Sequence, residues 1–503
     1  MRKGRYCNTS TLIWVFVGVT LGAGVVTGLG ILFRIHLANK WQQYTSLKPA
    51  HAPRRSDRIV VFAPHADDET LGCGGMLALA KKCGAHTRVV LVTNGDGFRV
   101  AVATAFRTVR VTPAKCIDFA YKRQQETIRA LGVLGVARQE ITFLGYPDRG
   151  IARLWDTNWA GTKLFYSKFT GWDRSPYANC FTFRAPYCGE SLLSDISKLL
   201  VRERPTDIYL PHPCDNHPDH YATYCFVMAA VKQIESKQPE LTARLKLHTY
   251  LVHRGDWPVP RGARLGSALA PPHALASGDT TWRSLPLPPE VARLKLRAIR
   301  AYRTQTAVEK GFLTSFGRAT ELFGSIPARS IRCQPDRRMS VDGRTEDWAG
   351  TPPVVIDPIR DYVVADLNKG GDVRSIYLCA DELRLYVRLD CVRNLSKHIN
   401  YTLNFRGLST NGANDWYSVT IRPGREAAPP GTRWAYRDNV LEVVVPLARL
   451  RRGHELAQRK YGENLFVQAC TTMMNLDVDN TGWHGFELMP ATPSSAPSFP
   501  SAP

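Results

Sequence analysis

The sequence predicts an α/β fold with a doubly wound, mostly parallel sheet, followed by a C-terminal antiparallel β-sandwich and preceded by one N-terminal transmembrane helix. Three observations predict this arrangement. Apolar strand patterns alternate with helical patterns up to residue 304, short alternating strands with turn residues follow from Met339, and residues 12–33 carry no charge. At 503 residues the chain is too long for one compact core, so we expect more than one domain.

Residues 12–33, which follow a basic segment at residues 1–11, are long enough to cross a membrane. Their 22 uncharged residues would form a helix of about 33 Å, and a hydrocarbon core is roughly 30 Å thick. A cleaved signal peptide is the alternative, but its apolar region is normally only ~7 to 15 residues long. We therefore expect a single-pass membrane protein with an extracytoplasmic catalytic domain. The spacing of Gly18 and Gly22 leaves a homodimer open.

A Rossmann-like pattern follows a polar spacer at residues 34–56 and extends over residues 57–325. Residues 58–63 and 87–93 are apolar, β-branched strands, and a helical pattern at 71–82 separates them. Strands that are apolar throughout and separated by helices are typical of a parallel sheet that is covered on both faces. In such sheets the active site lies at the carboxyl ends of the strands.

Residues 335–489 show the alternating short strands of an antiparallel β-sandwich, and the Pro- and Ser-rich tail at 490–503 is expected to be disordered. From Asp336 onward, 17 Arg and 3 Lys balance 20 acids, so the net charge of +22 lies wholly in the preceding part of the chain. A basic catalytic half suits an anionic lipid or an anionic polymer. Nucleic acid is excluded as the expected partner, because the sequence lacks helix-turn-helix, RRM-like and zinc-finger spacings.

The first strand pattern ends in a cluster of one histidine and three acids, which are His65, Asp67, Asp68 and Glu69. Three adjacent carboxylates repel one another at a buried sheet edge unless a cation offsets their charge. Helix capping by Asp67 or Asp68 is the alternative, and it accounts for one acid but not for the whole cluster. We interpret the cluster as part of a metal site.

A second cluster follows the strand pattern at residues 207–210. It places three histidines and two aspartates within nine residues: His212, Asp215, His217, Asp219 and His220. The carboxyl ends of parallel strands share one edge of the sheet, so the two clusters are expected to meet there. Imidazole-rich donors with one carboxylate suit Zn²⁺ held by three protein ligands and a water.

Together the two motifs resemble the PIG-L/LmbE family of zinc-dependent N-acetylglucosaminyl deacetylases over roughly residues 57 to 310. The motifs are His65-Ala66-Asp67-Asp68-Glu69 followed by Thr70-Leu71-Gly72, and His217-Pro218-Asp219-His220. The family usually reads His-Pro-Asp-Asp-Glu, whereas here Ala66 replaces the proline and Pro64 precedes the histidine. The donor types are retained, so the departure concerns the rigidity of the loop rather than the chemistry.

The resemblance assigns roles by motif position. It implies that Zn²⁺ is bound by His65, Asp68 and His220. It implies that Asp67 is the general base, and that His217 stabilises the tetrahedral oxyanion or protonates the leaving amine while Asp219 tunes it. By family position, the expected substrate-binding residues are Arg123, Asp148 and Asn94. The aromatic-rich residues 155–187 either contact the sugar or pack onto the domain.

The C-terminal part carries a second resemblance. Its motifs are Val341-Asp342-Gly343, Asp347-Trp348 and Leu385-Tyr386-Val387. They are similar to the opening of a family-9-type carbohydrate-binding, or DOMON-like, module. Such modules recognise glycans in some proteins and are spacers in others, so both roles stay open.

The sequence thus predicts a zinc-dependent N-deacetylase that acts on linear amide bonds. The expected reaction removes an N-acetyl group from an N-acetylglucosamine-type sugar in a glycan, glycolipid or glycoconjugate. Hydrolysis of another amide or ester on a glycoside is an alternative with the same fold. A membrane-tethered glycan-binding protein with an inactive catalytic half is an alternative of another class, and the intact Asp67 and His220 argue against it.

Overall fold

The structure is a computed structural model, and it describes residues 47–490 apart from 256, 277, 335, 336, 338, 360–368, 409–413, 426–429, 451–462 and 475. The predicted membrane segment 12–33 and the tail after residue 490 lie outside the described residues. Within the described part, no helix is long and apolar enough to cross a membrane. This finding contradicts the predicted single-pass membrane location. The longest described helix, α4 (Pro113–Val133), carries charged residues along its whole length.

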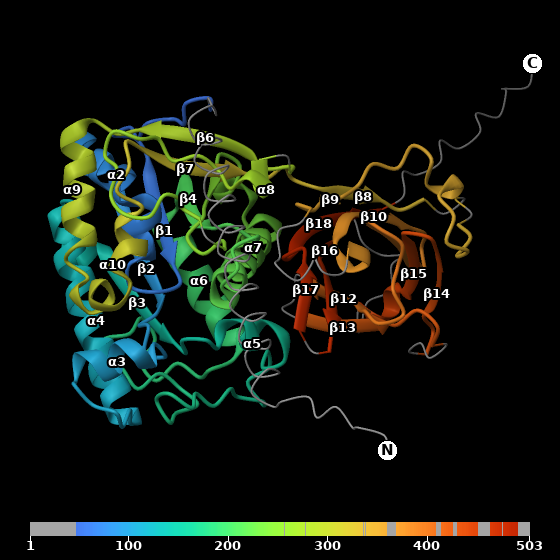
Figure 1. Cartoon of the computed structure of the whole chain (residues 1–503), viewed down its shortest axis with the longest axis horizontal. Helices are drawn as coiled ribbons and strands as arrows, with labels where there is room; N and C mark the ends of the chain where they lie inside the picture. Colours follow the sequence, from blue (N-terminus) through green and yellow to red (C-terminus); the bar gives the residue numbers. More distant parts are fainter. Residues whose placement is uncertain are drawn as a thin grey trace, which may run out of the picture.

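A seven-stranded mixed sheet with the order β3-β2-β1-β4-β5-β7-β6 forms the core of the α/β region (Figure 1). Its strands are β1 (Arg58–Ala63), β2 (His86–Thr93), β3 (Ile141–Tyr146), β4 (Asp207–Pro211), β5 (Lys246–Tyr250), β6 (Thr281–Pro286) and β7 (Thr320–Ser325). Neighbouring strands from β3 to β5 are parallel. Strand β7 runs antiparallel to both β5 and β6. The predicted α/β class is confirmed as a mixed α/β core, whereas β6 and β7 were not predicted.

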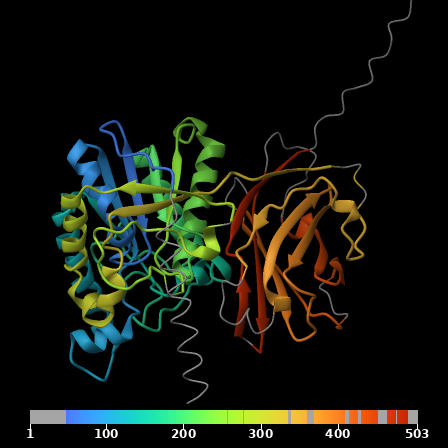
Figure 2. The same cartoon turned by 45° about the horizontal axis from the view of Figure 1, so that its top comes forward.

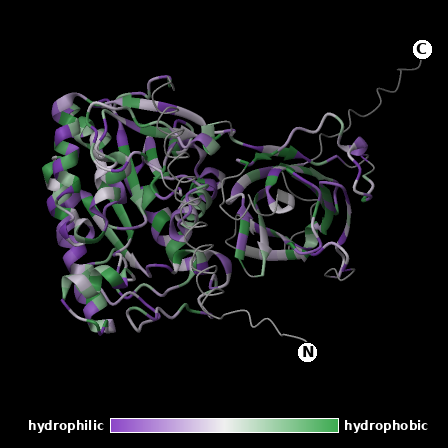
Figure 3. Ribbon diagram, in the orientation of Figure 1, coloured by the Kyte–Doolittle hydropathy of each residue, from purple (hydrophilic) through white to green (hydrophobic). Residues whose placement is uncertain are grey.

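Helices cover both faces of this sheet. They are α2 (Asp68–Cys83), α3 (Arg99–Ala105), α4, α5 (Ile151–Asp156), α6 (Gly189–Glu203), α7 (Pro218–Lys237), α8 (His273–Ala276), α9 (Pro289–Ile299) and α10 (Arg303–Thr314). Along β1, Ile59 and Val61 pack with α2, α4 and α9, while Val60 and Phe62 pack with α5, α6 and α7. Figure 3 shows the hydrophobic residues that follow from this double burial along the central strands.

Two further sheets form the C-terminal region. One has the order β14-β15-β11-β10-β9 and the other β13-β12-β16-β18-β8, with β17 paired to β16. The strands are β8 (Ser330–Arg332), β9 (Val355–Ile356), β10 (Val373–Ala380), β11 (Arg384–Cys391), β12 (Asn400–Leu408), β13 (Asn414–Ile421), β14 (Arg433–Arg437), β15 (Val440–Pro446), β16 (Glu463–Met473), β17 (Leu476–Asn480) and β18 (His484–Met489). Most pairs are antiparallel, and side chains of both sheets share one hydrophobic core.

Residues of the motif that resembles a carbohydrate-binding module form contacts in the interior of this region. Trp348 is buried, and its indole N–H donates to Glu442 at 2.5 Å. The same carboxylate accepts the backbone N–H groups of Asp342 and Gly343 at 2.9 and 2.7 Å. These contacts give the motif a structural role, and glycan binding by this region stays a prediction.

The C-terminal sheets pack against the α5 and α7 side of the α/β region, as the two views in Figures 1 and 2 show. The buried indole of Trp155 on α5 lies 5.2 Å from the ring of Phe466 and 5.9 Å from that of Trp483. Arg406 on β12 lies over the same indole and donates to the carbonyl of Asp156 at 3.1 Å. An aromatic cluster around a buried arginine therefore joins the two regions.

Candidate metal centre and active site

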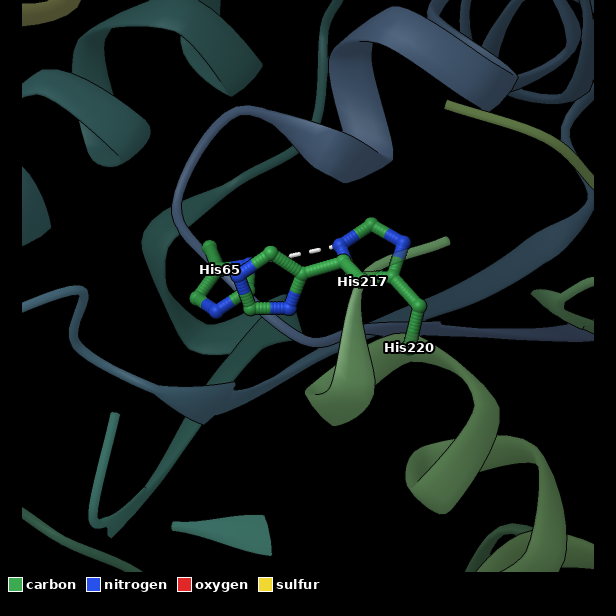
Figure 4. A group of neighbouring side chains, drawn as sticks. All are labelled: His65, His217 and His220. Atoms are coloured by element: carbon green, nitrogen blue, oxygen red, sulfur yellow. Dashed lines mark hydrogen bonds between the residues drawn. The ribbon is translucent and has the colours of Figure 1, made fainter. Parts of the chain in front are cut away.

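The carboxyl ends of β1 and β4 bring the two predicted clusters together. These strands are parallel neighbours in the sheet. His65 lies in the turn after β1, and His217 is the N-cap of α7, with Pro218 at the first helical position. His220 comes one turn later along the helix. Figure 4 shows the three histidine rings converging from the β1 turn and from the start of α7.

Three donor atoms form a small triangle at this edge. Nδ1 of His65 lies 3.2 Å from Oδ2 of Asp68 and 3.3 Å from Nε2 of His220. The third side, from Nε2 of His220 to Oδ2 of Asp68, is 3.0 Å. Ligand atoms at roughly 2.0 to 2.1 Å from a tetrahedral metal ion are about 3.3 Å apart. The size and chemistry of the triangle therefore fit a metal ion bound by two imidazoles and one carboxylate.

The second ring nitrogen of His65 faces two carboxylates. Its Nε2 lies 3.3 Å from Asp148 and 3.3 Å from Asp219. Asp219 also accepts the backbone N–H groups of Arg149 and Ile151 at 2.6 and 3.0 Å. These acceptors favour the tautomer in which Nε2 carries the proton and Nδ1 has a free lone pair. This is the arrangement in which a carboxylate orients a metal-binding histidine.

Asp215 does the same for His220. Its Oδ2 lies 3.1 Å from Nδ1 of His220 and accepts the backbone N–H groups of Val252 and His253, both at 3.0 Å. Burial lowers the pKa of His220, but the carboxylates of Asp215 and Asp68 outweigh it and raise the pKa to about 9. The two carboxylates therefore give the site a negative potential, which suits a bound cation.

Asp67 is next to a candidate ligand but lies outside the triangle. It is the N-cap residue of α2 and has a φ of 129°, a backbone conformation that is strained for a residue other than glycine. Its Oδ2 lies 3.5 Å from Arg123, whose guanidinium also donates to the carbonyl groups of Gly95 and Ala66. Burial raises the pKa of Asp67 well above its ordinary value, against the opposing effect of Arg123. A carboxylate with a raised pKa is a stronger proton acceptor.

His217 presents a proton donor to the same site. Its Nδ1 accepts the backbone N–H of Asp219 at 3.2 Å, so the neutral ring carries its proton on Nε2. Burial, together with His65 and His220, lowers the pKa of His217 to about 2, which keeps the ring neutral at physiological pH. The ring lies 4.6 Å from that of His65, edge to face. His217 is therefore arranged to donate a hydrogen bond.

A cavity of about 270 Å³ opens onto these groups. Its polar lining includes His65, Asp67, Arg123, Asp148, Arg149, His217, His253, Gln305 and Glu309. Its apolar lining consists of Leu71, Phe98, Phe312 and Leu313. The cavity therefore combines a polar floor at the metal site with an apolar wall, which is typical of small-molecule sites.

Residues 60–231 match the family described as GlcNAc-PI de-N-acetylase, or PIG-L, and this stretch contains both histidine motifs. The chain carries a PIG-L family domain. The predicted recognition is confirmed for this domain, and so is the prediction of an enzyme of the metal-dependent deacetylase class. No curated protein sequence matches the chain.

Solved structures are also similar to about half of the chain. The N,N'-diacetylchitobiose deacetylase from Pyrococcus horikoshii is 17% identical with a TM-score of 0.33, and the match covers 55% of this chain and 82% of that one. The zinc-inhibited form of the teicoplanin deacetylase Orf2 is 19% identical with a TM-score of 0.34, and the match covers 53% of this chain and 97% of that one. The 4-carboxy-2-hydroxymuconate hydratase GalB from Pseudomonas putida KT2440 is 14% identical with a TM-score of 0.32, and the match covers 51% of this chain and 82% of that one.

The structure brings together eight of the nine site residues predicted for the PIG-L domain. Asn94 is the exception, because it does not line the cavity, and its buried amide forms no hydrogen bond to any described residue. Arg123 and Asp148, expected to bind substrate, line the cavity but are also bonded within the site. The carboxylate of Asp219, which was expected to tune His217, contacts the ring of His65, while the backbone N–H of Asp219 donates to Nδ1 of His217.

Several residues of this site were missed or left open by the sequence. Asp215 orients His220, whereas His212 bonds to Thr280 and to the backbone of Cys214, which gives it a structural role. His253 stacks on Phe312 in the cavity wall, and its ring lies 4.9 Å from that of His220. His253 follows a predicted strand closely, and this position could have indicated that it lies at the site. Phe312 lies on a helix that carries no motif, so no such indication was present in the sequence.

Proposed function

We propose that the PIG-L domain is a zinc-dependent hydrolase that removes the acetyl group from an N-acetylglucosamine-type sugar. The observation that carries the proposal is the triangle of His65, Asp68 and His220, whose sides of 3.0 to 3.3 Å suit a tetrahedral ion. Two imidazoles and one carboxylate are a donor set typical of catalytic zinc. The family description, which names a GlcNAc-PI de-N-acetylase, supports this substrate class.

The residues of the chain divide the chemistry among them. A metal ion at the triangle would polarise the amide carbonyl and acidify a water molecule. Asp67 takes the proton from the attacking water, since it lines the cavity without being one of the three donors, and returns it to the amine nitrogen as the C–N bond breaks. His217 donates its Nε2–H to the carbonyl oxygen as negative charge develops there. Arg123 holds Asp67 in place through the ion pair between its guanidinium and the Asp67 carboxylate.

Metal and product analyses test this proposal directly. Purified protein should contain about one zinc ion per chain, as three ligands and a water imply. It should release acetate and free amine from N,N'-diacetylchitobiose, lose this activity to a chelator and regain it with zinc. Absence of bound metal would remove the basis of the proposal. Bound zinc without amine release from any N-acetylated sugar would contradict the substrate class.

Asp215→Asn should weaken zinc binding without abolishing it. The amide cannot hold the Nδ1 proton of His220 as the carboxylate does, and such changes typically cost about 10- to 100-fold in metal affinity. A competition titration with a chromogenic chelator measures the change. Asp195→Asn is the matched control, because Asp195 is a buried carboxylate bonded to Tyr146 and Thr182 away from the site. Equal losses in both variants would show a general effect of folding.

A further inference from the structure

Two segments, residues 97–115 and 157–187, lie beside the cavity. Phe98 lines the cavity and packs with Phe106 and Phe169 in one hydrophobic cluster. Gly171 approaches Pro113, so the tip of the second segment lies against the end of the first. The segments therefore form one continuous surface that begins at the cavity, and we call it the mouth surface. The first segment follows β2 and contains α3, and the second lies between α5 and α6 (Figure 1).

The mouth surface is strongly cationic. The two segments carry eight Lys and Arg residues and a single acid, Asp173. That acid already contacts its neighbour Arg174 at 3.1 Å. The exposed cations are Arg99, Arg107, Arg110, Lys163, Lys168 and Arg184, and none of them forms an ion pair with any residue that the structure describes. Such a field attracts an anionic ligand.

The second of these segments also carries exposed aromatic rings. Tyr166, Trp172 and Phe183 are 64%, 43% and 69% exposed. The guanidinium of Arg184 lies 5.6 Å from the centre of the Trp172 ring, which joins a cation to an aromatic face. Other rings of the same segment, such as those of Tyr177 and Tyr187, are fully buried. The segment therefore packs onto the domain with one set of rings and presents another set to solvent, and exposed groups of this kind mark binding sites.

We infer that the mouth surface binds the non-reacting part of an anionic glycan chain, and that the substrate is an extended N-acylated glycan carrying acidic groups. This inference rests on the proposed function and specifies its substrate class. A cavity of about 270 Å³ is at the small end of ligand sites, so it takes one sugar and leaves the rest of a chain outside. Aromatic faces stack on pyranose rings, and the unpaired cations complement carboxylate, sulfate or phosphate groups between them.

Two soluble hexasaccharides test the inference by titration calorimetry on the full chain. One is hyaluronan hexasaccharide, which alternates glucuronate with N-acetylglucosamine, and the other is the neutral N-acetylchitohexaose. The protein should bind the acidic hexasaccharide about tenfold more tightly at low salt, and this preference should shrink as salt is added. Arg107→Gln combined with Arg110→Gln should weaken binding of the acidic probe about tenfold.

Matched variants separate this inference from the proposed function. Lys237→Gln combined with Arg244→Gln removes two exposed cations outside the mouth surface and should leave binding unchanged. Asp67→Asn should lose turnover but retain hexasaccharide binding, so a failure of the proposed reaction leaves the binding result readable. Equal affinity for both probes would overturn the inference. Binding to phosphatidylglycerol vesicles without binding to the acidic hexasaccharide would also overturn it, in favour of a lipid surface.

Discussion

Asp67→Asn is expected to lower kcat by about 10²- to 10⁴-fold, the usual contribution of a general base. Asparagine is close in shape to aspartate and tolerates positive φ, so it can keep the backbone φ of 129° at this position. Its amide cannot accept a proton from water. Because Asp67 lies outside the donor triangle, the zinc content should stay unchanged. Initial-rate kinetics and elemental analysis of the same preparation measure both quantities.

Asp68→Asn is the matched control for this prediction. The two aspartates are adjacent in the sequence and both are buried, but only Asp68 lies within 3.2 Å of the candidate histidine donors. This variant should lose bound zinc and turnover together. Loss of zinc from the Asp67 variant as well would reassign Asp67 as a ligand, and a retained kcat would assign the base to another residue.

Short motifs predicted the part of the site that depends on local chain geometry. The β1 turn and the N-terminus of α7 each carry their donors within a few residues, and neighbouring parallel strands bring these two positions together. The sequence therefore indicated that the two clusters meet, and the resemblance to the PIG-L/LmbE family singled out His65, Asp68 and His220 as the metal ligands. The chemical types of the donors were sufficient to suggest a metal.

Long-range contacts explain what the sequence could not indicate. Asp219 is close to His217 in the sequence, but at the start of α7 its carboxylate points toward His65, which lies in the turn after β1. The cavity wall at Phe312 comes from α10, which packs against α3, a helix far from it in the sequence. Edge strand β6 was missed because its alternating pattern TWRSLP is short and half polar, which favours a loop prediction.

A buried ion pair behind the metal site carries the largest predicted effect on stability. Nζ of Lys295 donates to Oε1 of Glu321 at 2.6 Å and to the carbonyl of Leu71 at 2.7 Å, and both side chains are fully buried. The two oxygens of Glu321 accept the backbone N–H groups of Gly75 and Met76 at 2.6 and 2.7 Å. The pair therefore holds the middle of α2, the helix that begins at Asp68.

Lys295→Met should lower the free energy of unfolding by about 3 to 5 kcal/mol, because it leaves the Glu321 carboxylate buried without its cation. Adding Glu321→Gln should recover part of this loss, since the neutral amide oxygen still accepts a backbone N–H. Lys82→Met is the control, because Lys82 on α2 forms an exposed pair with Glu290 on α9 at 3.9 Å, and such a pair contributes less than about 1 kcal/mol. Urea denaturation of the four proteins measures the differences. If the two single variants at Lys295 and Lys82 lost similar stability, the buried pair would not be what holds α2, and the position of Asp68 would depend on the close packing of Gly72 against Tyr250 instead.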